Sequence, residues 1–243
     1  MEIRILYEDR DLIVCEKPAA ADSEGAGPMS MVTLLSALLQ GRGERSDIYP
    51  IHRLDRGVRG VMVYAKNRPA AARLSRALAD GLFQKRYLAV CQKDAASSLG
   101  ERGELTDLLF RDREKNKSYV VDRPRRGVKE ARLAFRVLGV VALREGTASL
   151  VEIRLFTGRT HQIRVQFSSR GHALLGDRKY GGPPLASPAL FSYSLAFPHP
   201  ENGRTLRFSL PVPDEYPWTA FPEALAAFGE FGFPGAEIGG KKE

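Results

Sequence analysis

Short strand-like runs recur along this chain without the regular alternation of strand and helix that is typical of a parallel sheet. Turns and basic loops separate these runs, and only a few stretches have helical periodicity. Parallel neighbours need a long crossover between them, whereas antiparallel neighbours can be joined by a short turn. The pattern therefore predicts an α+β fold with a mixed, mostly antiparallel sheet flanked by helices and loops.

The expected elements can be assigned to residue ranges. Two runs, 3–7 and 12–16, predict an N-terminal hairpin, and an apolar pattern resumes at 48–52. Further strands are expected at 61–65, 85–92, 118–121, 130–138, 148–156, 189–197 and 205–210. Helices are expected at 33–40, 69–80, 160–169 and 215–228. Asn67 and Thr160 are the expected N-caps of the second and third helices.

The 243 residues fit a single domain at 1–234, and the tail 235–243 is expected to be disordered. Cys15 and Cys91 lie in apolar runs, which predicts buried thiols in a reducing compartment. The cysteines and histidines lack the spacing of common zinc sites, so no metal is expected. The charged N-terminus and the absence of a long apolar stretch predict a cytoplasmic protein without membrane contact.

Positive charge is concentrated in the middle of the chain. The net charge is +8, and the whole positive excess lies within residues 52–180, between two acidic ends. Such a basic stripe favours a polyanionic partner, because each cation placed near a phosphate releases counterions. A surface made basic only for solubility is the alternative interpretation.

The first motif that suggests chemistry is HRLDR, at residues 52–56. Asp55 stands between Arg53 and Arg56, with Arg59 close in sequence. Neighbouring cations favour the ionised form of a carboxyl group, so Asp55 could serve as a nucleophile or base. A salt-bridged loop aspartate is the alternative on this pentapeptide alone.

Two further segments are dense in polar or aromatic groups. TGRTHQIRV, at 157–165, brings several donors to one end of an expected helix and could bind phosphate. Tyr87 follows two basic residues on an expected strand. A strand tyrosine is either a packing residue or a platform on which a base stacks.

Taken together, these motifs resemble the RluA-type family of RNA pseudouridine synthases. The similarity includes HRLD at 52–55, the KxYxA pattern at 85–89 and RTHQIR at 159–164. Similar segments at 171–181 and 197–200 extend the likeness to about residues 3–218. Many family members carry an N-terminal S4 RNA-binding domain, and none is expected in this sequence.

The resemblance implies isomerisation of uridine to pseudouridine in structured ribosomal or transfer RNA, by a monomer with no cofactor and no obligatory protein partner. It places the catalytic roles on Asp55 as nucleophile, Tyr87 as stacking aromatic and Arg164 as the partner of Asp55. Arg164 would hold the carboxylate by a charge-assisted bond, single or bidentate. Attack on C1′ and attack on C6 of the ring both remain open. The expected substrate-binding residues around a flipped nucleotide are His52, Arg53, Arg56, Arg159, His161 and Gln162.

One departure from the family pattern bears on activity. The family commonly follows HRLD with a Thr-Ser-Gly turn, whereas this chain has Val58-Arg59-Gly60. Hydroxyl groups that could orient the nucleophile loop are therefore missing. A catalytically silent RNA-binding or assembly protein that retains the fold is the alternative function.

Overall fold

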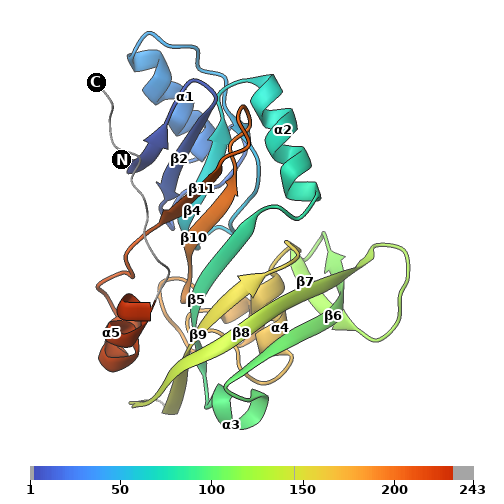
Figure 1. The fold of residues 1–243 in the computed structure, drawn as a ribbon. Coiled ribbons are helices and arrows are strands. Elements are labelled where there is room, and N and C mark those ends of the chain that lie inside the picture. Colours follow the sequence, from blue (N-terminus) through green and yellow to red (C-terminus); the bar gives the residue numbers. More distant parts are fainter. Residues whose placement is uncertain (1–2, 145, 232–243) are drawn as a thin grey trace.

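The computed structural model describes residues 3–144 and 146–231, so the expected tail at 235–243 lies outside the described residues. One sheet runs through the whole molecule (Figure 1). Its strands are β1 (Ile5–Glu8), β2 (Leu12–Lys17), β3 (Tyr49–Pro50), β4 (Arg59–Ala65), β5 (Gln84–Gln92), β6 (Arg102–Asp112), β7 (Lys117–Val121), β8 (Val128–Leu143), β9 (Gly146–Leu155), β10 (Leu190–Pro198) and β11 (Thr205–Ser209). The helices are α1 (Met31–Gly41), α2 (Arg68–Ala79), α3 (Ala95–Leu99), α4 (Gln162–Ser168) and α5 (Pro222–Phe231), with 3₁₀ turns at Arg178–Tyr180 and Trp218–Ala220.

The strand order confirms the expected α+β fold with a mixed, mostly antiparallel sheet. The order is β1-β2-β4-β10-β5-β9-β8-β6-β7, with β11 paired to β10 and β3 to β4. Among the described strands, β4 and β10 form the parallel pair, and Ser192 lies opposite Gly60 there. A Cβ added at Gly60 would lie 2.4 Å from the Ser192 carbonyl oxygen, so this close approach requires glycine.

Strand β10 joins two lobes of the sheet. The first lobe contains β1, β2 and β4, with α1 on one face and α2 on the other (Figure 1). Alternate residues of β2 point to opposite faces, so Ile13 packs on the side of α1 and Val14 on the side of α2. Both faces are covered, which explains why every residue of β2 is buried.

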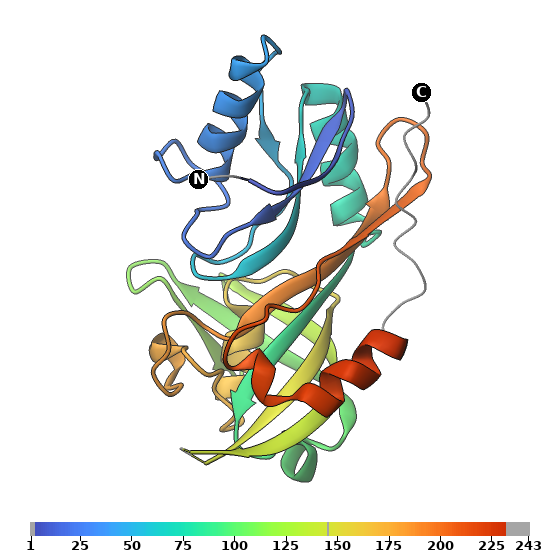
Figure 2. The same cartoon turned by 90° about the vertical axis from the view of Figure 1, so that its left-hand side faces the viewer.

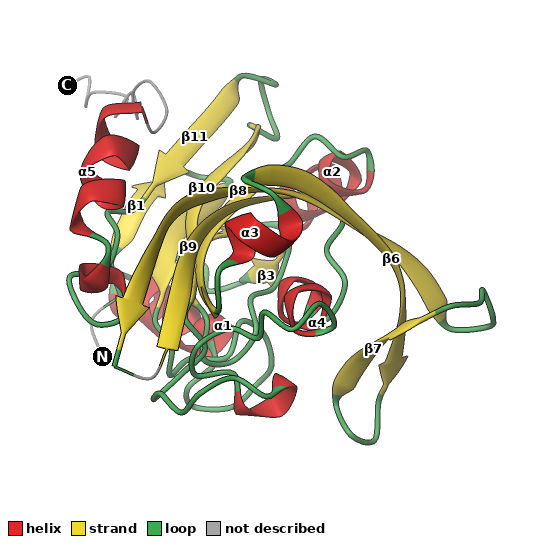
Figure 3. Ribbon diagram, turned by 90° about the horizontal axis from the view of Figure 1, so that it is seen from below, coloured by secondary structure: helices red, strands yellow, loops and turns green. Residues whose placement is uncertain are grey.

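The second lobe is a strongly curved sheet that encloses α4 (Figure 3). Phe167 of α4 meets Phe135 of β8 edge to face, with ring centroids 6.0 Å apart. Helix α5 packs against β8 on the outside of the sheet (Figure 2). Added to Gly139 of β8, a Cβ would lie 2.9 Å from that of Ala224, so the missing side chain lets the helix approach closely. The curved lobe thus fixes α4, which carries Arg164, against its concave side.

Two expected local features are confirmed, the cap of α2 and the burial of the two thiols. Asn67 is the N-cap of α2 and accepts a hydrogen bond from the Ala70 amide at 2.9 Å. Cys15 and Cys91 are buried free thiols, and burial raises the pKa of each to about 12. None of the described helices is both long enough and apolar enough to cross a bilayer.

Other local expectations were wrong. Strand β6 and helix α3 were not predicted; β6 is rich in polar residues, and its apolar run at 108–110 is short. Helix α4 begins at Gln162, and its N-cap is His161 in the left-handed conformation, so Thr160 does not cap it. The segment expected as one helix at 215–228 contains a 3₁₀ turn followed by α5.

Candidate active site

Asp55 lies in the loop between β3 and β4, and this loop is tied to the rest of the first lobe. The hydroxyl group of Ser23 both accepts from the Leu54 amide at 2.9 Å and donates to the Leu54 carbonyl at 2.7 Å. The Gly57 amide donates to the Ala19 carbonyl at 2.9 Å. Two bonds to the residue just before Asp55 and one to a residue just after it fix the position of the carboxylate.

The partner of Asp55 comes from the second lobe. Arg164 Nη1 donates to Asp55 Oδ2 at 3.0 Å, while its Nε and Nη2 bind the two oxygens of Asp177 at 2.6 and 2.8 Å. The bidentate contact is therefore made with Asp177, and the contact with Asp55 is single. Burial opposes the guanidinium charge of Arg164, but the bond to Asp177 and the charges of both carboxylates hold its pKa above the usual value. The arginine remains a fixed cation beside Asp55.

The arginines that flank Asp55 in sequence are paired with other carboxylates. Arg53 donates to Glu24 at 2.9 Å, and Arg56 lies 3.8 Å from Asp22. Their side chains remain 51% and 74% exposed, so both can still meet a ligand from solvent. Arg59 forms an ion pair with Glu16.

His161 extends the polar cluster on the other side of Asp55. Its Nε2 lies 3.8 Å from Asp55 Oδ2, and its Nδ1 lies 2.9 Å from the hydroxyl oxygen of Tyr180. That oxygen also accepts the Ser118 amide at 2.8 Å. Because the acceptor role is then filled by Ser118, the hydroxyl proton of Tyr180 is available to Nδ1, which favours a ring proton on Nε2, facing Asp55.

We expect His161 to be neutral throughout the physiological range. Burial lowers its pKa to about 4, against the opposing influence of Asp55. Between pH 4 and the ordinary pKa near 6.5, His161 binds more protons in the unfolded chain than in the folded one. The free energy of unfolding is therefore highest above pH 6.5 and decreases as the pH falls toward 4. When the pH is lowered from 7 to about 4.5, the free energy of unfolding should fall in both proteins. The decrease should be about 2 kcal/mol smaller in His161→Gln than in the wild-type protein. Urea unfolding at the two pH values measures this difference, and equal losses in the two proteins would contradict the shift.

The three residues expected to be catalytic line one cavity of about 560 Å³. The same cavity is lined by five of the six expected substrate-binding residues, namely His52, Arg53, Arg159, His161 and Gln162. Tyr87 stands on β5 between β10 and β9 and is 5% exposed. Burial raises the pKa of its hydroxyl group above the usual value, against a hydrogen bond with Ser192. Tyr87 therefore presents a neutral, fixed ring to the cavity.

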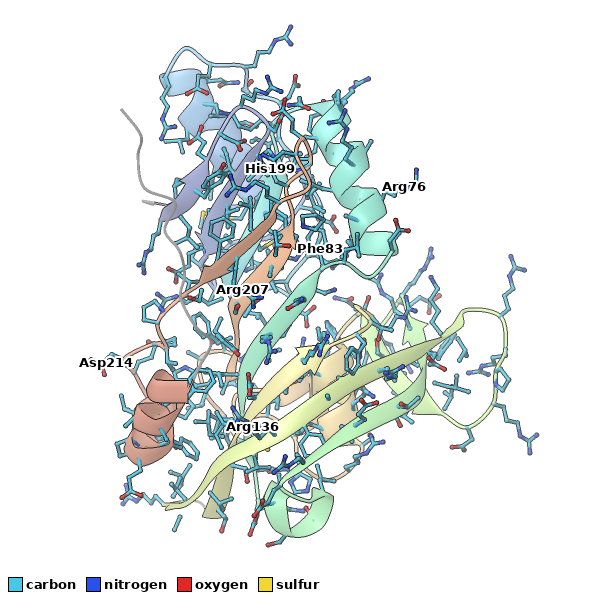
Figure 4. All side chains as sticks on the ribbon, in the orientation of Figure 1. Arg76, Phe83, Arg136, His199, Arg207 and Asp214 are labelled. Carbon is cyan, nitrogen blue, oxygen red and sulfur yellow. The ribbon has the colours of Figure 1, made fainter. Side chains whose placement is uncertain are left out.

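The remaining lining residues differ in what their polar groups do. Gln162 is 2% exposed. Its side-chain oxygen accepts hydrogen bonds from the Thr157 hydroxyl and the Arg159 amide, and its side-chain NH₂ donates to the Arg132 carbonyl, so it stabilises the turn before α4. His52 accepts the Val63 amide through Nε2 at 3.3 Å. Burial, followed by the charge of Lys85, lowers the pKa of His52 to about 3. The His52 ring lies edge-on to that of Phe83. Phe83 is the residue just before β5 and is labelled in Figure 4.

The family was decided by comparison with known proteins. The family model described as RNA pseudouridylate synthase matches residues 11–169, which include Asp55, Tyr87 and Arg164. The chain belongs to the RNA pseudouridylate synthase family. It is therefore an RNA pseudouridine synthase, an isomerase that modifies RNA.

Curated relatives cover most of this synthase. An RNA pseudouridine synthase of Aquifex aeolicus is 34% identical over 88% of this chain and 71% of its own. The ribosomal large subunit pseudouridine synthase D of Zymomonas mobilis is 33% identical over 88% of this chain and 70% of its own. The protein of the same description from Vibrio parahaemolyticus is 35% identical over 95% of this chain and 73% of its own. The RluA-type resemblance is confirmed.

Solved structures confirm the fold. The human protein described as RNA pseudouridylate synthase domain containing 1 superposes with a TM-score of 0.72 and 22% identity, covering 87% of this chain and 84% of its own. The human protein described as RNA pseudouridylate synthase domain containing 4 superposes with a TM-score of 0.70 and 22% identity, covering 87% of this chain and 89% of its own. Both share the fold of this synthase.

Sequence reasoning missed three residues that hold the synthase site together: Ser23, Asp177 and Tyr180. Asp177 is fully buried, and Tyr180 has Arg164 over its ring at 5.1 Å. Asp177 and Tyr180 belong to the segment 171–181, which was noted only as a similarity to the family. A carboxylate within that segment was the available signal, but nothing local indicates its partner. Among the described residues no cluster of three or more histidine, cysteine or acidic side chains could hold a metal ion.

Proposed function

We propose that this synthase converts uridine to pseudouridine in ribosomal RNA of the large subunit, with Asp55 as the nucleophile. The observation that carries the assignment is the 3.0 Å contact between Arg164 and Asp55 at a cavity large enough for a nucleotide. The names of the relatives from Zymomonas and Vibrio support the large-subunit target. The basic stripe at 52–180 supports a long polyanionic substrate.

Each side chain has a role in this proposal. Asp55, held by Arg164, attacks C1′ or C6 of a flipped-out uridine. The Tyr87 ring stacks on the uracil and keeps it in place while it turns, because the detached base must not escape. His161 presents an N–H group to the same space, and Arg53 and Arg56 are free enough to bind phosphates at the rim. The two halves of the site come from different lobes, so the substrate lies where the lobes meet.

The test is modification of unmodified transcripts. We expect the protein to introduce pseudouridine into a large-subunit ribosomal RNA transcript, detected by carbodiimide-dependent stops of reverse transcription. Small-subunit ribosomal RNA and pooled transfer RNA transcripts serve as parallel substrates. Modification confined to transfer RNA would contradict the ribosomal target. A complete absence of stops in all three kinds of transcript would overturn the proposed substrate.

A further inference from the structure

One buried cation in the cavity is left without a counter-charge. Lys85 of β5 is 9% exposed and lines the cavity. Within residues 3–144 and 146–231 its ammonium group has neither an ion pair nor a hydrogen bond. The buried Lys17, in contrast, donates to the carbonyl groups of Pro18 and Ala21 at 3.0 and 2.6 Å. The ammonium group is not among the buried side-chain atoms of the described residues that lack a partner, so it opens onto the cavity and is available to an anionic ligand.

The groups around Lys85 add positive charge rather than negative. Burial, followed by the charge of Arg159, lowers the pKa of Lys85. His52 lies close enough to feel the charge of Lys85 and is neutral. A Cβ added at Gly158 would lie 3.2 Å from Lys85 Nζ, so the missing side chain leaves space beside the ammonium group. The site is an open, electropositive corner of the cavity.

The position of this corner selects the part of the substrate that would fill it. Among the described residues Asp55 pairs with Arg164 and lies near His161, and no ion pair joins it to Lys85. Lys85 is therefore set apart from the reacting carboxylate, although it faces the same cavity as Tyr87, two residues along the strand. A nucleotide with its base over Tyr87 and its ribose at Asp55 has its backbone phosphates displaced from the reacting carbon.

We propose that Lys85 and Arg159 form a phosphate subsite that binds a backbone phosphate of the RNA next to the target uridine. This inference rests on the proposed function. In this proposal Lys85 contacts the phosphate backbone of the RNA and does not contact the detached uracil. The two possibilities differ in what they change, since a backbone contact governs RNA affinity and its dependence on salt, while a contact with the base governs the rate of the bound complex.

The experiment measures the RNA affinity of Lys85→Met between about 50 and 200 mM salt, with a fluorescein-labelled large-subunit RNA fragment that the protein modifies. We expect a dissociation constant raised about tenfold at the lower salt concentration and a slope of log affinity against log salt reduced by about 1. The half-saturating RNA concentration should change more than the saturated single-turnover rate. The melting temperature should stay the same or rise, because the substitution removes an uncompensated buried charge.

Two further variants make the result decisive. Arg204→Met removes one exposed charge from the connection between β10 and β11, which does not line the cavity, and should change the slope by less than half as much. Lys85→Gln should reduce the slope of log affinity against log salt by the same amount, and it replaces Lys85→Met in the experiment if that variant is poorly soluble. An unchanged slope would overturn the subsite, and a lower saturated rate with unchanged affinity would assign Lys85 to the base. Failure of the proposed function can be told apart from failure of the phosphate subsite, because in the first case the wild-type protein would form no pseudouridine in the large-subunit RNA.

Discussion

Replacement of Asp55 by asparagine is expected to lower pseudouridine formation by about a thousandfold or more while the protein stays folded. The amide oxygen can still accept the hydrogen bond from Arg164, so the geometry of the loop is preserved. What is lost is the charged oxygen that attacks the nucleotide in the proposed mechanism. Single-turnover formation of pseudouridine in a large-subunit transcript measures the effect.

The structure also predicts that this variant keeps its stability. Arg164 retains its bidentate partner Asp177, so removing the charge of Asp55 leaves no isolated cation. Asp47→Asn is a matched control, because Asp47 is an exposed loop carboxylate outside the cavity. It should retain full activity. If Asp55→Asn also retained full activity, Asp55 would not be the nucleophile.

Arg164→Met is expected to cost both activity and stability. It leaves the fully buried Asp177 without its cation, and breaking a buried ion pair by removing one partner costs about 3 to 5 kcal/mol. Adding Asp177→Asn removes the stranded charge, so the double variant should recover most of the lost stability in urea unfolding. It should not recover activity, because Asp55 still lacks its partner.

A less buried ion pair on the segment after α4 provides the comparison. Arg170 binds Asp107 at 2.9 Å, and its side chain is 27% exposed. Arg170→Met should therefore cost only about 1 kcal/mol. A loss this small in Arg164→Met would show that Asp177 does not depend on Arg164. Activity in the double variant would show that Asp55 reacts without it.

Local patterns were sufficient to predict much of the fold. The cap at Asn67 and the helically spaced apolar positions of α2 are local signals, so the helix expected at 69–80 is found at Arg68–Ala79. The buried strands β2, β4 and β10 are short apolar runs with clear ends. Strand β6 was missed because its stability comes from pairing with β7 and β8, which no local pattern reveals.

The contacts of the site depend on tertiary structure, and sequence proximity was misleading there. The arginines on either side of Asp55 suggested local cations, yet both pair with other carboxylates. The cation that binds Asp55 lies 109 residues further along the chain. That partnership was accessible only through the family resemblance, and the bond between Arg164 and Asp177 was not predicted at all.

The place of β10 in the sheet has a consequence for biosynthesis. Asp55 and Arg164 stand on lobes that meet through β10, which pairs with β4 on one side and with β5 on the other. All other strands of this path precede β10 in sequence, so a growing chain that has reached only α4 already contains every residue expected to be catalytic but lacks the strand that joins them. We therefore expect the two halves of the site to stay unjoined in a growing chain until residues 190–198 have left the exit tunnel and inserted.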